Sequence, residues 1–129
     1  MVHRTCLIEL LKSDALLLIE PSGPGAEAFY TGKVFEYMNT GRPILATIPY
    51  SGAAAQLIMH TKTGLVSDYN DIEGTVENLT YLYNCWLNNS QPLESNISEV
   101  QKYERKELTK LLVEVLNDSF KKAGLEDFK

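Results

Sequence analysis

The chain has 129 residues, a formal charge of −5 at pH 7 and a sequence pI near 5.0. Its 12 basic side chains against 17 acidic ones leave no basic surplus to neutralise a phosphate backbone, which argues against nucleic acid as the main partner. The two cysteines make no disulfide framework, no His/Cys cluster predicts a metal, and no apolar run approaches the roughly 20 residues that span a bilayer. We expect one domain, residues 1–129, with a loose tail from about residue 118.

Helical and strand patterns alternate along the chain. Apolar residues at three- and four-residue spacing predict helices, and short continuous apolar runs predict strands that are covered on both faces. The predicted elements, in chain order, are a helix at 3–13, a strand at 15–19, a helix at 31–40, a strand at 43–48, a helix at 52–60, a strand at 64–67, a helix that begins after residue 71, and a helix at about 98–117. This alternation predicts an α/β fold with a parallel sheet and helices on both faces.

Capping residues indicate where the predicted helices begin and end, and apolar stripes indicate which side of each helix faces the core. Gly41 is placed for the left-handed position that follows a helix, and Asp71 is placed to cap the next long helix. The apolar stripe of that long helix is expected to face the core; it consists of Ile72, Val76, Leu79, Tyr83 and Trp86. Tyr83 and Trp86 could alternatively form a stacking platform. Near the C-terminus, Ser98 and Gln101 fit a capping box.

The polar residues best suited to chemistry gather where the helix at 31–40 starts. Ligands of open α/β sheets bind at the carboxyl ends of the strands, and this helix follows the first strand. Thr31, Gly32 and Lys33 offer a hydroxyl, an unobstructed backbone and a positive charge, which suit a diphosphate without a metal. Glu36 lies on the Lys33 side of the helix and could accept hydrogen bonds from two ribose hydroxyls. The alternative is structural, with Thr31 as a cap and Lys33–Glu36 as a solvated ion pair.

Residues after the later strands face the same edge of the sheet. Ser51 and Gly52 follow the second strand, and they could line a cleft at the start of the next helix. Asp68 follows the third strand, where an aspartate is more typical of a turn. No GxGxxG or Walker loop accompanies these positions, so the residues alone leave the ligand class open.

Three segments of the chain resemble the C-terminal, nucleotide-sugar-binding domain of GT-B glycosyltransferases, especially the retaining family 4. Residues 13–18 (SDALLL) resemble the strand before the donor loop. Residues 32–46 (GKVFEYMNTGRPILA) resemble the family segment K-l-f-E-Y-l-a-x-G-k-P-i-l-a, and residues 64–66 (GLV) resemble the strand that follows. The likeness covers most of residues 3–117. It implies a Rossmann-like sheet that forms part of one GT-B half and ends in long helices.

The resemblance also implies roles for individual residues. Glu36 stands at the second glutamate of the family's E-x7-E motif, which holds the ribose of the nucleotide. The first glutamate of that motif would fall at Ala28; Glu27, one residue away, is the candidate catalytic residue that faces the donor sugar. Lys33 resembles a lysine found in a subset of these enzymes and is placed near the diphosphate. No metal or cofactor is expected besides the nucleoside diphosphate sugar.

The implied activity is the retaining transfer of a sugar from a nucleoside diphosphate sugar to an acceptor, in cell-surface polysaccharide or glycolipid synthesis. The acceptor, a glycan or lipid-linked glycan, would be bound by an N-terminal domain that precedes Met1, so we expect residues 1–129 alone to be inactive. We expect a cytoplasmic protein, with any attachment to the inner membrane made through that other domain. Two alternatives are another GT-B enzyme, such as a UDP-sugar epimerase, and a non-catalytic α/β module that binds partners through open sheet edges.

Overall fold

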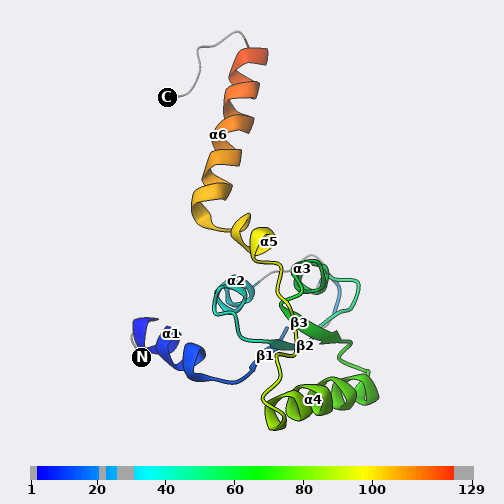
Figure 1. The fold of residues 1–129 in the computed structure, drawn as a ribbon. Coiled ribbons are helices and arrows are strands. Elements are labelled where there is room, and N and C mark those ends of the chain that lie inside the picture. Colours follow the sequence, from blue (N-terminus) through cyan, green and yellow to red (C-terminus); the bar gives the residue numbers. More distant parts are fainter. Residues whose placement is uncertain (1–2, 21–22, 26–30, 124–129) are drawn as a thin grey trace. The chain divides into compact units, whose positions relative to one another are not determined.

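The computed structural model describes residues 3–20, 23–25 and 31–123 (Figure 1). Its elements are α1 (His3–Lys12), β1 (Leu16–Ile19), α2 (Gly32–Asn39), β2 (Ile44–Thr47), α3 (Ala53–Thr61), β3 (Gly64–Ser67), α4 (Ile72–Leu87), α5 (Ile97–Gln101) and α6 (Arg105–Lys122). The chain divides into two compact units, Met1–Asn96 and Ile97–Lys129. The first unit holds the whole sheet.

The sheet has three parallel strands in the order β1-β2-β3. In this register Leu16 lies beside Ile44 and Ile44 beside Gly64. Right-handed connections place α2 and α3 on one face of the sheet, and α4 returns along the other face (Figure 1). The predicted α/β class, the parallel sheet and the helices on both faces are therefore confirmed.

The core lies between the sheet and the helices α2 and α3. Its largest fully buried apolar side chains come from all of these elements: Leu18, Val34, Ile44, Ile48 and Ile58. Gly64 has a packing role, because a Cβ added there would meet the Ile44 carbonyl oxygen and lie 2.9 Å from Ile58 Cγ2. The missing side chain lets β3 approach both neighbours closely, which explains a glycine inside a strand.

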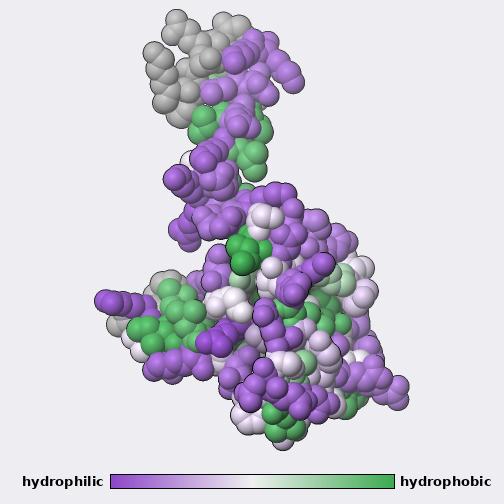
Figure 2. Space-filling view, in the orientation of Figure 1, coloured by the Kyte–Doolittle hydropathy of each residue, from purple (hydrophilic) through white to green (hydrophobic). Residues whose placement is uncertain are grey.

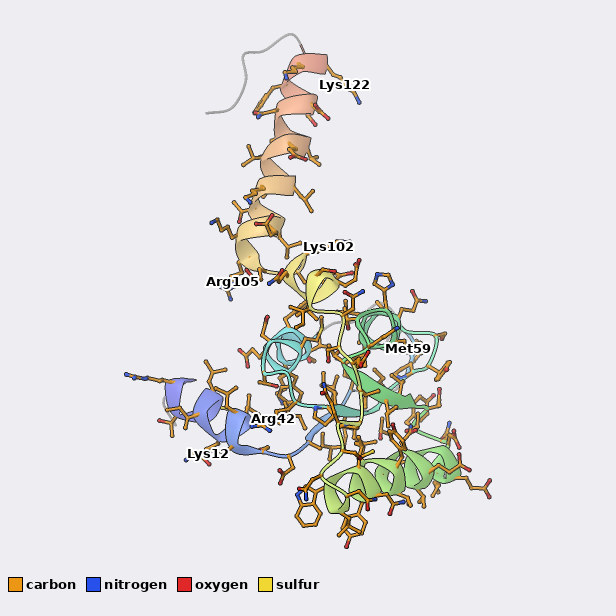
Figure 3. All side chains as sticks on the ribbon, in the orientation of Figure 1. Lys12, Arg42, Met59, Lys102, Arg105 and Lys122 are labelled. Atoms are coloured by element: carbon orange, nitrogen blue, oxygen red, sulfur yellow. The ribbon has the colours of Figure 1, made fainter. Side chains whose placement is uncertain are left out.

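A left-handed glycine follows α2, and a side chain distant in sequence satisfies a carbonyl at the end of α1. Gly41 follows α2 with a φ of 69°, which confirms the predicted left-handed position. Thr40 Oγ1 donates to the Tyr37 carbonyl at 2.7 Å and accepts from Arg42 N at 3.1 Å. The Arg42 guanidinium donates to the Leu11 carbonyl at the end of α1, through Nη2 at 2.6 Å and Nε at 3.1 Å (Figure 3). This side chain therefore satisfies a carbonyl that has no partner within α1.

The expectation that β1 is covered on both faces is wrong. Leu16 and Leu18 are buried, whereas Leu17 is 56% exposed and Ile19 is 67% exposed. These two side chains lie on the face of the sheet that α4 covers, but α4 packs over β3 and β2. No described helix of the first unit reaches across to β1 on this side.

The expectation for the α4 stripe is also wrong. Asp71 caps α4 as predicted, with its Oδ1 accepting from Gly74 N at 2.9 Å. The side that meets the sheet is instead partly polar: Thr75 Oγ1 bonds Ser67 Oγ at 2.7 Å, and Asn78 Nδ2 donates to the Val66 carbonyl at 3.2 Å. Leu82 is the buried apolar residue of this side. Short polar side chains let the helix approach β3 closely, so the apolar stripe is turned to solvent.

The second unit is helical and differs from the single helix predicted at about 98–117. The chain breaks between α5 and α6, and α5 begins at Ile97, so Ser98 lies inside a helix rather than at its cap. The α6 helix continues to Lys122, so the tail expected from residue 118 is helical that far; residues 124–129 lie outside the described residues. None of the described helices is long and apolar enough to cross a membrane.

Candidate functional site

A buried carboxylate lies at the C-terminal edge of the sheet, where the sequence predicted a ligand site. Glu20 directly follows β1 and is only 6% exposed. Its Oε1 accepts hydrogen bonds from Thr31 N at 3.3 Å and from Thr31 Oγ1 at 3.2 Å. Glu20 therefore places a negative charge at the N-terminus of α2, where the helix dipole favours it. Sequence reasoning missed this residue; the available signal was an acidic side chain at the end of an apolar strand.

Thr31 occupies the N-cap position of α2, but its side chain makes no cap hydrogen bond to the helix. Its backbone is extended, with φ −89° and ψ 148°, and its hydroxyl donates to Glu20. The structural alternative of an ordinary threonine cap is therefore wrong. The carboxylate of Glu20 instead accepts the N–H of the N-cap residue Thr31 itself.

Two backbone donors remain at the start of α2. Val34 N already donates to the Thr31 carbonyl at 3.2 Å, but no described residue accepts from the N–H groups of Gly32 and Lys33. An added Cβ at Gly32 would meet no described atom within 4 Å, and the Lys33 side chain is exposed. An anion could therefore approach this backbone beside Glu20 and also reach a lysine ammonium.

Glu36 lies one turn into α2 and is half-buried. Val34 and Met38 anchor the opposite side of the helix in the core, with exposed fractions of 0% and 3%. Within the described part of the chain Lys33 and Glu36 form no ion pair, so the predicted solvated pair is absent there. Glu27, the candidate catalytic residue, lies outside the described residues.

The ends of β2 and β3 complete this edge of the sheet. Gly52 is buried at the N-cap of α3 and donates to the Pro49 carbonyl at 2.9 Å, whereas Ser51 is exposed. The Asp68 carboxylate accepts from Tyr50 N and from Asn70 N, each at 3.3 Å. Asp68 thus has the predicted turn role and also holds the chain that leaves β2. Because the strands are parallel and adjacent, Ser51 lies on the same edge as the start of α2.

Among the residues that the structure describes, no group of three or more His, Cys, Asp or Glu side chains could hold an ion. Cys6 and Cys85 are free and half-buried. On α4, a hydrogen bond with Cys85 and its charge raise the pKa of Tyr81, whose hydroxyl donates to the Pro92 carbonyl at 2.8 Å.

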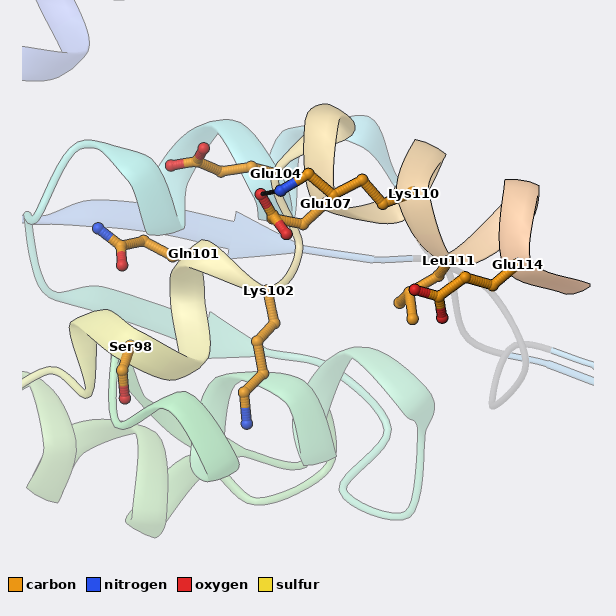
Figure 4. Close-up of a pocket in the computed structure, with 8 residues that line it drawn as sticks. All are labelled: Ser98, Gln101, Lys102, Glu104, Glu107, Lys110, Leu111 and Glu114. Atoms are coloured by element: carbon orange, nitrogen blue, oxygen red, sulfur yellow. Dashed lines mark hydrogen bonds and ion pairs between the residues drawn. The ribbon is translucent and has the colours of Figure 1, made fainter. Parts of the chain in front are cut away.

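A hollow of about 550 Å³ lies in the second unit, along α5 and α6 (Figure 4). It is lined by Ser98, Gln101, Lys102, Glu104, Glu107, Lys110, Leu111 and Glu114. Lys102 is paired with Glu99 and Lys110 with Glu107, each at 2.7 Å. Its lining contains none of the residues predicted to bind a ligand, and both of its lysines are already paired at the surface. The edge of the sheet remains the better candidate site.

Comparison with known proteins finds no match, whether among protein-family models, curated proteins or solved structures. The fold is an α/β unit with a three-stranded parallel sheet. Any more specific assignment depends on the geometry at the start of α2 and on the resemblance carried by the sequence.

Proposed function

We propose that this chain is the donor-binding portion of a glycosyltransferase. The activity would be the transfer of a sugar from a nucleoside diphosphate sugar to an acceptor, in cell-surface polysaccharide or glycolipid synthesis. The proposal combines the resemblance of residues 32–46 to the donor segment of family 4 with the site at the start of α2. In this view the parallel sheet is part of a Rossmann-like GT-B half.

The observation that carries the proposal is the pair of N–H groups at Gly32 and Lys33, from which no described residue accepts. They lie at a helix N-terminus, at the ligand-binding edge of a parallel sheet, with open space over Gly32. Glu20 accepts from Thr31 beside them, so a diphosphate would bind next to a carboxylate rather than in its place. The Lys33 ammonium supplies the opposing positive charge for such a ligand.

Five of the predicted residues have a role in this proposal. The N–H groups of Gly32 and Lys33 bind the diphosphate, and the carboxylate of Glu36 accepts hydrogen bonds from the ribose hydroxyls. Glu27 faces the donor sugar, as the resemblance implies. Ser51, exposed after β2, lines the neighbouring part of the cleft.

The chemistry asked of these residues is positioning and electrostatic stabilisation. As the bond between the sugar and the diphosphate breaks, negative charge builds on the departing phosphate, where N–H donors and an ammonium stabilise it most. The acceptor and its binding domain are supplied from outside residues 1–129, so this piece alone does not turn over. A cytoplasmic location, with membrane attachment through that other domain, is part of the same proposal.

A ligand titration followed by amide chemical shifts tests the proposal. UDP, GDP and their sugars are added in turn to residues 1–129, and the expected result is saturable shifts centred on Gly32, Lys33 and Glu36. The variant Glu36→Ala should lose ribose-dependent binding, and Glu73→Ala, an exposed acid on the opposite side of the sheet, is the matched control. Shifts that are scattered over the surface, or equal in both variants, contradict the donor site.

The exposed apolar stripe of α4 favours a second candidate, a non-catalytic α/β interaction module. A module of this kind needs no nucleotide, so Glu36→Ala would change only surface properties, by about 0.5 kcal/mol or less in unfolding free energy. The same titration separates the two functions, because the module predicts no saturable nucleotide shifts at the start of α2.

A further inference from the structure

The exposed stripe of α4 has the spacing of a helix-pairing surface. Its members are Ile72, Val76, Leu79, Tyr83 and Trp86, each at least 55% exposed. The steps between them alternate strictly between four and three residues. That 3.5-residue repeat is typical of two paired helices, whereas a helix that packs on a sheet buries a broader face. Green, hydrophobic surface is visible at the lower edge of α4 in Figure 2.

The stripe contains rigid aromatic anchors. Tyr83 and Trp86 stack on each other, with ring centroids 6.0 Å apart and an interplanar angle of 23°. Each is more than half exposed, although aromatic side chains normally bury much of their surface. Tyrosine and tryptophan are enriched at the centres of protein interfaces, where they lose little conformational entropy on binding.

The stripe itself carries no charged side chain. The sequence of α4 contains no lysine or arginine, and its acids Glu73 and Glu77 lie outside the stripe. Charged residues are depleted at interface centres because an unpaired buried charge is costly. The same stripe of a second copy could therefore pack against it without burying an unpaired charge.

Beside α4 lies a bare part of the sheet. Leu17 and Ile19 are exposed on the same face, over β1, while α4 covers β2 and β3. The connections between the strands are right-handed, and α4 is a right-handed helix that runs antiparallel to the strands. Together these place the stripe on the side of α4 that points toward β1. The stripe and the bare strand therefore form the two walls of one apolar corner.

The amount of apolar surface in this corner suits a dimer. A half-exposed large side chain offers on the order of 100 Å². Seven such side chains, five from α4 and two from β1, offer on the order of 700 Å². A standard interface buries about 800 Å² on each partner. The largest apolar patch of a typical monomer, at about 300–600 Å², is smaller.

We propose that this corner is a self-association surface occupied by α4 of a second copy of the chain. Each copy supplies a helix and a corner beside it, so the surface is complementary to itself, as a twofold interface requires. For each α4 to occupy the corner of the other copy, the twofold axis must run parallel to α4. The two helices are then parallel to each other, and Leu79 contacts Leu79 of the second copy. The proposal does not depend on the proposed function, since the start of α2 lies on the other side of the sheet.

The test is the oligomeric state of residues 1–129, without nucleotide. Trp86 is the single tryptophan, so its emission reports directly on the stripe. Sedimentation velocity should show a monomer–dimer equilibrium, with Trp86 emission moving to shorter wavelength as the dimer forms. Leu79→Glu should weaken the dimer by about tenfold or more. Gln56→Glu, exposed on α3 at the other face of the sheet, should not, and circular dichroism verifies that both variants fold.

A cross-linking arm tests the parallel arrangement. Leu79→Cys should form a disulfide-linked dimer under mild oxidation, whereas Gln56→Cys should not exceed the wild-type baseline that Cys6 and Cys85 provide. A chain that stays monomeric up to about 1 mM overturns the proposal and leaves the corner to another partner. A dimer whose dissociation constant is unchanged by Leu79→Glu also overturns the proposal. So does a dimer that does not cross-link through Leu79→Cys.

Discussion

Removing the Glu20 carboxylate should lower stability and raise anion affinity at the same time. In the wild type, this buried side chain accepts two hydrogen bonds from Thr31 and lies at the N-terminus of α2. Each hydrogen bond to a charged group contributes about 1.5–3 kcal/mol, and a charge at a helix end about 0.3–1 kcal/mol. Because Thr31 is half-buried, water replaces part of the loss, and removing a buried charge recovers desolvation energy. We expect Glu20→Ala to lower the unfolding free energy by about 2 kcal/mol.

The assay is urea unfolding followed by far-ultraviolet circular dichroism at neutral pH, with Glu20→Gln as the comparison variant. Glutamine keeps an oxygen acceptor but loses the charge, so it should destabilise by about half as much. The same variants are titrated with inorganic phosphate, and Glu20→Ala should bind more tightly because it exposes the Thr31 N–H and removes a competing anion. An Ala variant that is as stable as wild type within about 0.5 kcal/mol would refute the role of Glu20 at the helix start.

Three further predictions concern glycines and a cap. Gly64→Ala should destabilise by about 1–3 kcal/mol in urea unfolding because its Cβ meets the Ile44 carbonyl; an unchanged midpoint would contradict this packing. Gly32→Ala should change stability by no more than about 0.5 kcal/mol yet weaken nucleotide binding in calorimetry, and equal binding would mean that no phosphate approaches this backbone. Asp71→Ala should cost about 0.5–2 kcal/mol and speed amide exchange in the first turn of α4, because Gly74 N loses its acceptor; unchanged exchange would exclude the cap.

The order and type of the elements in the first unit followed from local patterns. Short apolar segments between the helical patterns predicted all three strands. Gly41 and Asp71 marked helix ends correctly because their effects act through the adjacent backbone. The same locality placed Thr31, Gly32 and Lys33 at the carboxyl edge of the sheet. Whether that edge binds a nucleotide stays a prediction.

Tertiary packing decided which surfaces are buried. Periodicity showed that Ile72, Val76 and the aromatic pair of α4 share one stripe, but it could not show that Thr75 and Asn78 would meet the sheet instead. A helix settles with the side that allows the closest approach and satisfies polar groups, and that choice depends on the residues of β3. Exposure of Leu17 and Ile19 has the same origin, because it depends on where α4 lies.

The partner of Glu20 was also decided by the tertiary structure. Glu20 and Thr31 are joined only because β1 ends beside the first turn of α2. No pattern of spacing predicts a hydrogen bond across such a loop. The sequence by itself thus determined which segments fold into strands and helices and which edge carries the polar residues. Packing between those segments decided which carboxylate accepts from the helix and which apolar face is left for a partner, because both depend on contacts between residues far apart in the chain.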